Sequence, residues 1–172
     1  NGMALVTENR RQEGLLMDLP VSENLSMAAM GRFARGGWIG GGRIGAEVRR
    51  LVERLRIKCD PDGLQPVRTL SGGNQQKVVI GKWLLTEPKI LILDEPTRGI
   101  DVGSKFDVYQ IIQELAAQGT AILCISSELE ELMGICDRIV VMSRGQIEGQ
   151  FGREAFDDEQ ILEAAFRGHK RK

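Results

Sequence analysis

The first half of the chain carries apolar residues at helical spacing on either side of a glycine-rich segment. Residues 20–30 and residues 46–58 each place leucine, valine or methionine on one face of a predicted helix. Residues 22–24, Ser-Glu-Asn, offer the first of these helices an N-terminal cap. Seven glycines lie within residues 31–45, which predicts a mobile loop between the two helices.

The second half alternates short, continuous apolar runs with helical stripes. Such runs are typical of strands buried in a parallel sheet, and the helices between them form right-handed crossovers. The runs lie at 90–93, 121–125 and 139–142, and the stripes at 108–115, 129–133 and 161–166. Residues 5–7 form a further short apolar segment that could end a strand. The pattern predicts an α/β fold with a mainly parallel sheet.

Turn signals divide these elements. Polar residues at 8–14 and the sequence Asp-Pro-Asp-Gly at 60–63 predict turns, and Gly119 is placed to close the helix before it. Arg144 and Gly145 lead from the run at 139–142 into another extended segment. Most connections are therefore predicted to be short.

Composition narrows the class of protein. The chain has 172 residues, 42% of them hydrophobic and 27% charged, so it has enough apolar residues for a core and is not expected to be disordered. A net charge of −1 excludes an overall basic footprint for nucleic acid, and no apolar run approaches the length of a membrane span. Three cysteines without C-x-x-C spacing and a single histidine argue against a zinc site and a Ser/His/Asp triad.

Two adjacent carboxylates, Asp94 and Glu95, follow the apolar run at 90–93. Ligands bind at the carboxyl ends of parallel strands, and paired carboxylates are costly there unless they meet a cation or hydrogen-bond donors. Asp94 would hold Mg²⁺, and Glu95 would orient or deprotonate a water that attacks a γ-phosphate. The alternative is an Asp-Glu pair that opens a solvated turn.

A second candidate site begins at Ser71, which is a good N-cap for the helix that follows. Gly72 and Gly73 would let the backbone approach a ligand, and the free N–H groups of the new helix would attract an anion. The alternative is an ordinary capped helix with two turn glycines. The two candidate sites lie about 20 residues apart, and together they are more specific than either one.

Together the two segments resemble a known family. LSGGNQQK at 70–77 and ILILDEPTRGID at 90–101 are similar to the signature motif, Walker B motif and D-loop of ABC-transporter ATPases. The details resemble the second nucleotide-binding half of bacterial ATPase subunits that import monosaccharides such as ribose and galactose. The resemblance covers nearly the whole chain and implies a partial P-loop NTPase-like core. It divides the chain into a Q-loop region at 1–19, a helical subdomain with the signature motif at 20–88 and the rest of the ATPase core at 89–172.

The chain departs from the family pattern at three places. It has no Walker A sequence, so we expect it to be the last part of a nucleotide-binding domain and to be inactive as an ATPase alone. Glu8 stands at the Q-loop glutamine position and Ser127 at the switch-histidine position. A serine cannot replace an imidazole as a charge sensor, so this side of the site is expected to be degenerate.

The resemblance also implies how the chain acts and with what. Ser71, Gly72, Gly73 and Gln75 would contact, in trans, an ATP held with Mg²⁺ by the first nucleotide-binding half, and Asp101 would lie at the shared interface. The implied function is ATP-driven import of a simple sugar. The alternative is a non-hydrolytic module that completes a partner's ATP site. A DNA-repair or chromosome ATPase head is disfavoured because no heptad repeat is present.

The implied location is the cytoplasmic face of the inner membrane, as a peripheral subunit. Its partners would be the first nucleotide-binding half, the membrane permease and, indirectly, a periplasmic sugar-binding protein, with no nucleic acid. Apolar residues after the Q-loop region could dock on the permease or pack the helical subdomain; they are Leu15, Leu16, Met17, Leu19, Met27 and Met30. The isolated chain is also expected to self-associate, because bared sheet edges and apolar faces favour association.

Overall fold

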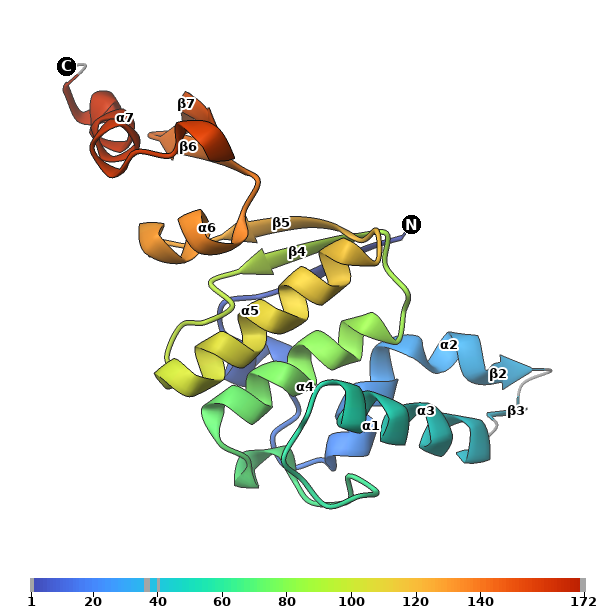
Figure 1. Ribbon diagram of the computed structural model, residues 1–172. Helices are drawn as coiled ribbons and strands as arrows, with labels where there is room; N and C mark the ends of the chain where they lie inside the picture. The colour runs from blue at the N-terminus through green and yellow to red at the C-terminus, as the bar shows by residue number, and fades with distance from the viewer. Residues whose placement is uncertain (1, 36–37, 40, 171–172) are drawn as a thin grey trace. The chain divides into compact units, whose positions relative to one another are not determined.

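The computed structural model describes residues 2–35, 38–39 and 41–170, and these fold as two compact units. The first unit extends to Ile125 and the second begins at Ser126 (Figure 1). The first unit contains both candidate sites in full.

A parallel sheet of three strands organises the first unit. The strands are β1 (Met3–Val6), β4 (Ile90–Asp94) and β5 (Ala121–Ile125), in the order β1-β4-β5. Met3 pairs with Ile90, and Ile90 in turn pairs with Ala121. The sequence predictions of a parallel sheet and of strands at these positions are confirmed. The predicted burial is wrong, because β4 is buried only at alternate positions and no residue of β5 is buried.

Two long helices stabilise the sheet. Helix α4 (Gly72–Leu84) contacts β1 and α5, and α5 (Val102–Ala117) contacts β5. Residues 75–81 of α4 are all buried, so this helix is the centre of the unit rather than a surface element. Gly119, with φ +93°, follows α5, and its N–H donates to the carbonyl of Ala116, as expected of a helix-closing glycine.

A helical layer lies on the other side of α4 (Figure 1). It comprises the π-helical turn η1 (Arg10–Gly14), α1 (Val21–Ser26), η2 (Met27–Ala29), α2 (Met30–Phe33), α3 (Gly41–Arg54) and η3 (Val67–Thr69). Helix α1 packs on both α3 and α4. The predicted turn at 60–63 is confirmed, and the N–H of Gly63 donates to the carbonyl of Asp60.

Three local predictions in this layer are wrong. Residues 8–14 contain η1 instead of a simple turn, because the side chain of Asn9 accepts from the N–H of Gln12 and starts a helix. The described residues of 31–45 form the end of α2, the pair β2 (Ala34–Arg35) and β3 (Trp38–Ile39), and the start of α3, not a loop. Residues 36, 37 and 40 lie outside the described residues.

The predicted cap at 22–24 is also wrong. Pro20 is the N-cap of α1, and the helix begins at Val21. Asn24 is buried, and its amide bonds to the backbone of Leu16 in both directions, at 2.8 and 3.0 Å. Its polar side chain therefore anchors the preceding loop and does not cap the helix.

The second unit is a hairpin covered by a helix. It contains α6 (Leu129–Ile135), β6 (Arg138–Ser143), β7 (Gln146–Gly152), η4 (Arg153–Ala155) and α7 (Asp158–Lys170). The run at 139–142 is a strand, as predicted, but it pairs antiparallel with β7 and not with the parallel sheet. Arg144 and Gly145 both have positive φ, which suits a tight two-residue hairpin turn. Ile139, Val141, Ile161 and Ala164 form the core of this unit.

Candidate functional site

The candidate catalytic pair lies at the carboxyl end of β4. Asp94 is the last residue of the strand and pairs with Ile125. The N–H of Glu95 donates to the carbonyl of Ile125 at 2.9 Å, so the chain stays attached to β5 one residue beyond the strand. Glu95 has a φ of +45°, a left-handed conformation that is costly for a residue with a side chain. The fold therefore fixes both carboxylates at the edge of the sheet where ligands bind in parallel folds.

A turn carries the chain from Glu95 to α5. The N–H of Arg98 donates to the carbonyl of Glu95 at 3.1 Å, Thr97 is buried, and Gly99 has a φ of +68°. Asp101 is the N-cap of α5 and accepts from the hydroxyl of Ser104 at 2.7 Å and from its N–H at 3.0 Å. The hydrogen bond from the Ser104 hydroxyl is the main cause, and the bond from the Ser104 N–H the second cause, of a pKa of Asp101 below its usual value. Asp101 is thus a structural cap as well as a candidate interface residue.

Ser71 caps α4, as the sequence predicts. Its Oγ accepts from the amide Nδ2 of Asn74 at 2.9 Å and from the N–H of Asn74 at 3.4 Å. Helix α4 has 13 residues, so its first turn presents free N–H groups and a partial positive charge. This end of α4 is an arrangement that favours an anion.

The glycines that follow Ser71 are needed for packing within the chain. A Cβ on Gly73 would stand 2.1 Å from the Oγ of Ser104, and a Cβ on Gly72 would stand 3.0 Å from a guanidinium nitrogen of Arg10. The first turns of α4 and α5 are therefore in contact through Gly73 and Ser104. The backbone of α4 at Gly72 also lies close to the side chain of Arg10.

Gln75 is held inside the protein. Its side chain is buried, and its Nε2 donates to the carbonyl of Leu70 at 3.0 Å and to that of Val67 at 3.4 Å. Gln75 therefore anchors the loop before Ser71 to the buried side of α4. Sequence reasoning missed Asn74, which binds Ser71 and also accepts from the N–H of Lys58 at 2.9 Å; the signal was its place three residues after a capping serine.

Glu8 lies in the segment after β1 and forms an ion pair with Arg98 in the turn before α5. Arg10, two residues further on, reaches the same turn and donates to the carbonyls of Arg98 and Gly99. The structure thus brings Glu8 together with the 98–99 turn. Sequence reasoning gave Arg10 no role, because a bond between residues 88 positions apart leaves no local pattern.

Ser127 lies at the start of the second unit, between β5 and α6. The neighbouring Ser126 accepts from the N–H of Glu128 at 3.0 Å, which orders the backbone around Ser127. Ser127 thus follows strand β5, none of whose residues is buried.

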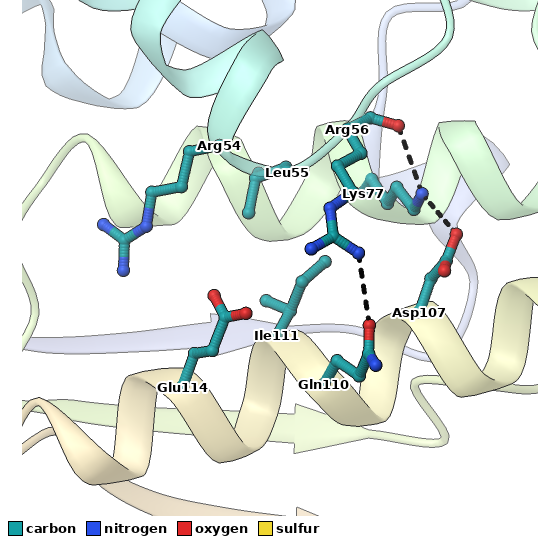
Figure 2. A pocket seen from close by; sticks show the side chains of 8 residues that line it. All are labelled: Arg54, Leu55, Arg56, Lys77, Asp107, Gln110, Ile111 and Glu114. Atoms are coloured by element: carbon teal, nitrogen blue, oxygen red, sulfur yellow. Dashed lines mark hydrogen bonds and ion pairs between the residues drawn. The ribbon is translucent and has the colours of Figure 1, made fainter.

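A hollow lies between α3, α4 and α5, away from these residues (Figure 2). The ammonium group of Lys77 donates to Asp107 at 2.7 Å and to the carbonyl of Arg56 at 3.2 Å. A guanidinium nitrogen of Arg56 donates to the side chain of Gln110 at 3.3 Å. Because Lys77 is paired with Asp107 and Arg56 with Gln110, we interpret this hollow as a joint between helices and not as a ligand site.

The donor set limits what metal chemistry the chain can support. Across the described ranges, no group of three or more His, Cys, Asp or Glu side chains is placed to hold a metal ion. Mg²⁺ commonly binds one or two carboxylates together with phosphates and water, so Asp94 alone fits one position of such a site.

The six apolar residues considered for docking divide into three groups. Met17 and Leu19 are half-buried. Leu15 is buried and packs the helical layer. Leu16 is 49% exposed, and Met27 and Met30 are each 40% exposed. None of the helices in the described parts of the chain has the length and apolarity required to cross a bilayer.

Comparison with known proteins agrees with this geometry. The chain is 46% identical over 170 residues to the "Ribose import ATP-binding protein RbsA" of Geobacillus kaustophilus, which covers 99% of this chain and 34% of that protein. It is 48% identical over 169 residues to a "Putative ribose/galactose/methyl galactoside import ATP-binding protein 1" of Rhizobium etli, which covers 98% of this chain and 32% of that protein. The chain thus spans about a third of the length of the curated relatives it matches.

A solved structure shares the fold. It is the ADP conformation of MJ1267, an ATP-binding cassette of an ABC transporter, with a TM-score of 0.76 and 24% identity over 96% of this chain and 68% of that one. The family model described as "ABC transporter" matches residues 3–98, which include the capped α4 and the Asp94–Glu95 pair. The chain belongs to the ABC transporter family.

Proposed function

We propose that the chain is the C-terminal part of the second nucleotide-binding domain of a bacterial ATP-binding subunit that drives the import of a simple sugar. The motifs at 70–77 and 90–101 support this, as do the names of the relatives, which are import ATP-binding proteins for ribose and for galactosides. Under this proposal residues 1–19 form the Q-loop region, 20–88 the helical subdomain and 89–172 the rest of the ATPase core.

The observation that carries the proposal is the N-terminus of α4. Ser71, Gly72 and Gly73 present an anion-binding helix end whose position is fixed by contact with α5. We propose that this end contacts the phosphates of an ATP held by the first nucleotide-binding half, while Gln75 supports it from within and Asp101 lies at the shared interface. Mg²⁺ would neutralise phosphate charge in the intact subunit, and Asp94 would supply one carboxylate ligand.

Residues of this chain support the view that the ATP site containing Asp94 and Glu95 is degenerate. Glu8 is paired with Arg98 instead of standing alone at the Q-loop position, and Ser127 replaces the switch histidine. Hydrolysis at Glu95 is therefore the less supported role, and completion of the partner's site the better supported one. This favours the non-hydrolytic module as the second candidate function for the chain itself.

The proposed setting is the cytoplasmic face of the inner membrane. The partners are the first nucleotide-binding half, the permease subunits and, through them, a periplasmic sugar-binding protein. The exposed Leu16, Met27 and Met30 offer apolar contacts for the permease.

Substitution of Ser71 tests the proposed role in trans. In the full-length subunit assembled with its permease, Ser71→Arg should reduce sugar transport and ATP hydrolysis at least tenfold, because a bulky cation would fill the anion site. Thr69→Arg, an exposed position two residues earlier, is the matched control and should retain activity. Full activity of the Ser71 variant would show that the proposed function is wrong.

Substitution of Glu95 separates the two candidate functions. Mg-ATP binding and hydrolysis are measured for the purified chain and for the full-length subunit, each with and without Glu95→Gln. If Glu95→Gln leaves ATP hydrolysis by the full-length subunit unchanged, the result supports a chain that completes the ATP site of the first nucleotide-binding half. Glu95-dependent turnover by the purified chain would show that it carries a phosphate site of its own.

A further inference from the structure

Arg10 joins two segments that are far apart in the sequence. It lies at the start of η1, four residues after the end of β1. One guanidinium nitrogen donates to the carbonyl of Arg98 at 2.9 Å, and the other donates to the carbonyl of Gly99 at 3.2 Å. A single planar fork therefore binds two successive carbonyls of the turn that leads into α5.

The surroundings of Arg10 show that this contact is specific. Burial, and after it the nearby charge of Arg11, lowers the pKa of Arg10, and its Nε is buried with no hydrogen-bond partner among the described residues. The acidic neighbour Glu8 pairs with Arg98, so two parallel links run from the segment after β1 to the same turn. A partly desolvated guanidinium persists only where its bonds offset the loss of water.

The same guanidinium also touches the start of α4. A Cβ on Gly72 would lie 3.0 Å from the nitrogen that binds Gly99, and 3.4 Å from the carbonyl oxygen of Gly99. The side chain of Arg10 thus lies between the 98–99 turn and the first residue of α4. A side chain at position 72 would press on the tip of the Arg10 side chain, which would have to move by a few tenths of an ångström.

We propose that Arg10 is a positioning residue that holds the 98–99 turn against the first turn of α4. A displacement of the segment after β1 would then be transmitted through one side chain to the anion-binding end of α4. The positioning role of Arg10 within the chain is independent of the proposed function. The expected effect of Arg10 on ATP hydrolysis rests on the proposed function.

Hydrogen exchange of the purified chain tests the contact itself. Arg10→Gln should speed amide exchange at least tenfold at Asn74, Gln75, Ser104 and Lys105, whose N–H groups are hydrogen-bonded at these two helix starts, while β4 and the β6–β7 hairpin keep their protection. Arg10→Lys can donate to one carbonyl but lacks the fork, so an intermediate effect is expected. Arg11→Gln, the exposed neighbour, is the matched control and should leave exchange unchanged. Unchanged exchange in Arg10→Gln, or faster exchange throughout the first unit, would overturn the proposal.

Kinetics of the full-length subunit with its permease test the consequence. Arg10→Gln should lower kcat at least tenfold and leave KM for ATP within about twofold, because the nucleotide is proposed to bind the first half before α4 meets it. Ser71→Arg is measured in parallel. An active Ser71→Arg would reject the proposed function while the exchange result still decides the role of Arg10. An inactive Ser71→Arg beside a fully active Arg10→Gln would overturn the inference.

Discussion

At the scale of single residues, the tightest constraint is the contact between Gly73 and Ser104. An alanine at 73 would place its Cβ 2.1 Å from the Oγ and 2.3 Å from the Cβ of Ser104, so one helix must shift. We expect Gly73→Ala to lower the free energy of unfolding by about 1–3 kcal/mol, as measured by urea denaturation. Gly31→Ala, in α2 with open space around its Cα, is the control and should be neutral or stabilising.

A second substitution shows whether the steric contact is the cause. Ser104→Gly removes both atoms that the new methyl group meets. The double variant should therefore lose less stability than the sum of the two single variants. Strict additivity would mean that Gly73 is needed for another reason, such as its backbone conformation.

The lowered pKa of Asp101 predicts a pH-dependent contribution to stability. Its carboxylate is favoured in the folded state by Ser104, so the contribution is present above the unfolded carboxyl's pKa of about 3.9 and is lost as pH falls through the lower native value. The Tm of the parent chain should exceed that of Asp101→Asn near neutral pH, and the difference should shrink under acid conditions. In a Ser104→Ala background the difference should be much smaller. A difference that stays constant into strong acid would contradict this assignment.

Single-residue roles were predictable where local pattern determines them. Ser71 as a helix cap and Asp94 at a strand end both follow from the few residues around them. Arg10 was not predictable, because its partners lie 88 and 89 positions away and are backbone carbonyls, which carry no sequence signal. Gln75 falls between these cases, since its motif position was evident but its burial depends on tertiary packing.

At the scale of elements, α4 and α5 are joined by a buried charge. The side chain of Lys77 is 4% exposed and that of Asp107 is 39% exposed, with 2.7 Å between Nζ and Oδ2 (Figure 2). Removing the carboxylate leaves an ammonium group buried, whereas removing the lysine leaves a carboxylate that water can reach. Asp107→Ala should therefore destabilise the chain by about 2 kcal/mol, and Lys77→Met by less, in urea denaturation. The reverse order would mean that the aliphatic stem of Lys77 contributes more than its charge.

The elements also show which sequence signals are reliable. Short apolar runs predicted the positions of β4 and β5 correctly, because continuous β-branched and leucine residues favour strands. They did not predict the burial, since β4 is buried only at alternate positions and no residue of β5 is buried. The prediction of a loop at 31–45 was wrong. Glycine lowers helix propensity, which favoured the loop, yet α3 includes Gly41, Gly42 and Gly45. The buried face formed by Val48, Leu51 and Val52 is sufficient to stabilise that helix, so tertiary packing overrides propensity.

At the scale of the whole molecule, the two faces of the parallel sheet differ sharply. Val6, Leu91 and Leu93 are fully buried on the face that carries α4 and α5. The alternate positions leave large apolar side chains exposed, namely Met3, Leu5, Ile90, Leu123 and Ile125. β1 and β5 are also the two edge strands, and open edges can pair with another chain. An apolar face flanked by open edges favours association between copies of the purified chain.

Sedimentation velocity over a range of concentrations measures this association. The parent chain should shift to larger species as concentration rises, and Leu5→Lys combined with Leu123→Lys should move it toward the monomer, because two cations then interrupt the apolar face. Val102→Lys combined with Phe106→Lys adds the same charge to exposed positions on α5 and should leave association unchanged. A parent chain that stays monomeric and melts in one sharp transition would mean that the exposed face does not drive association. Equal effects of the two lysine pairs would instead assign the change to net charge, because only the first pair alters the sheet.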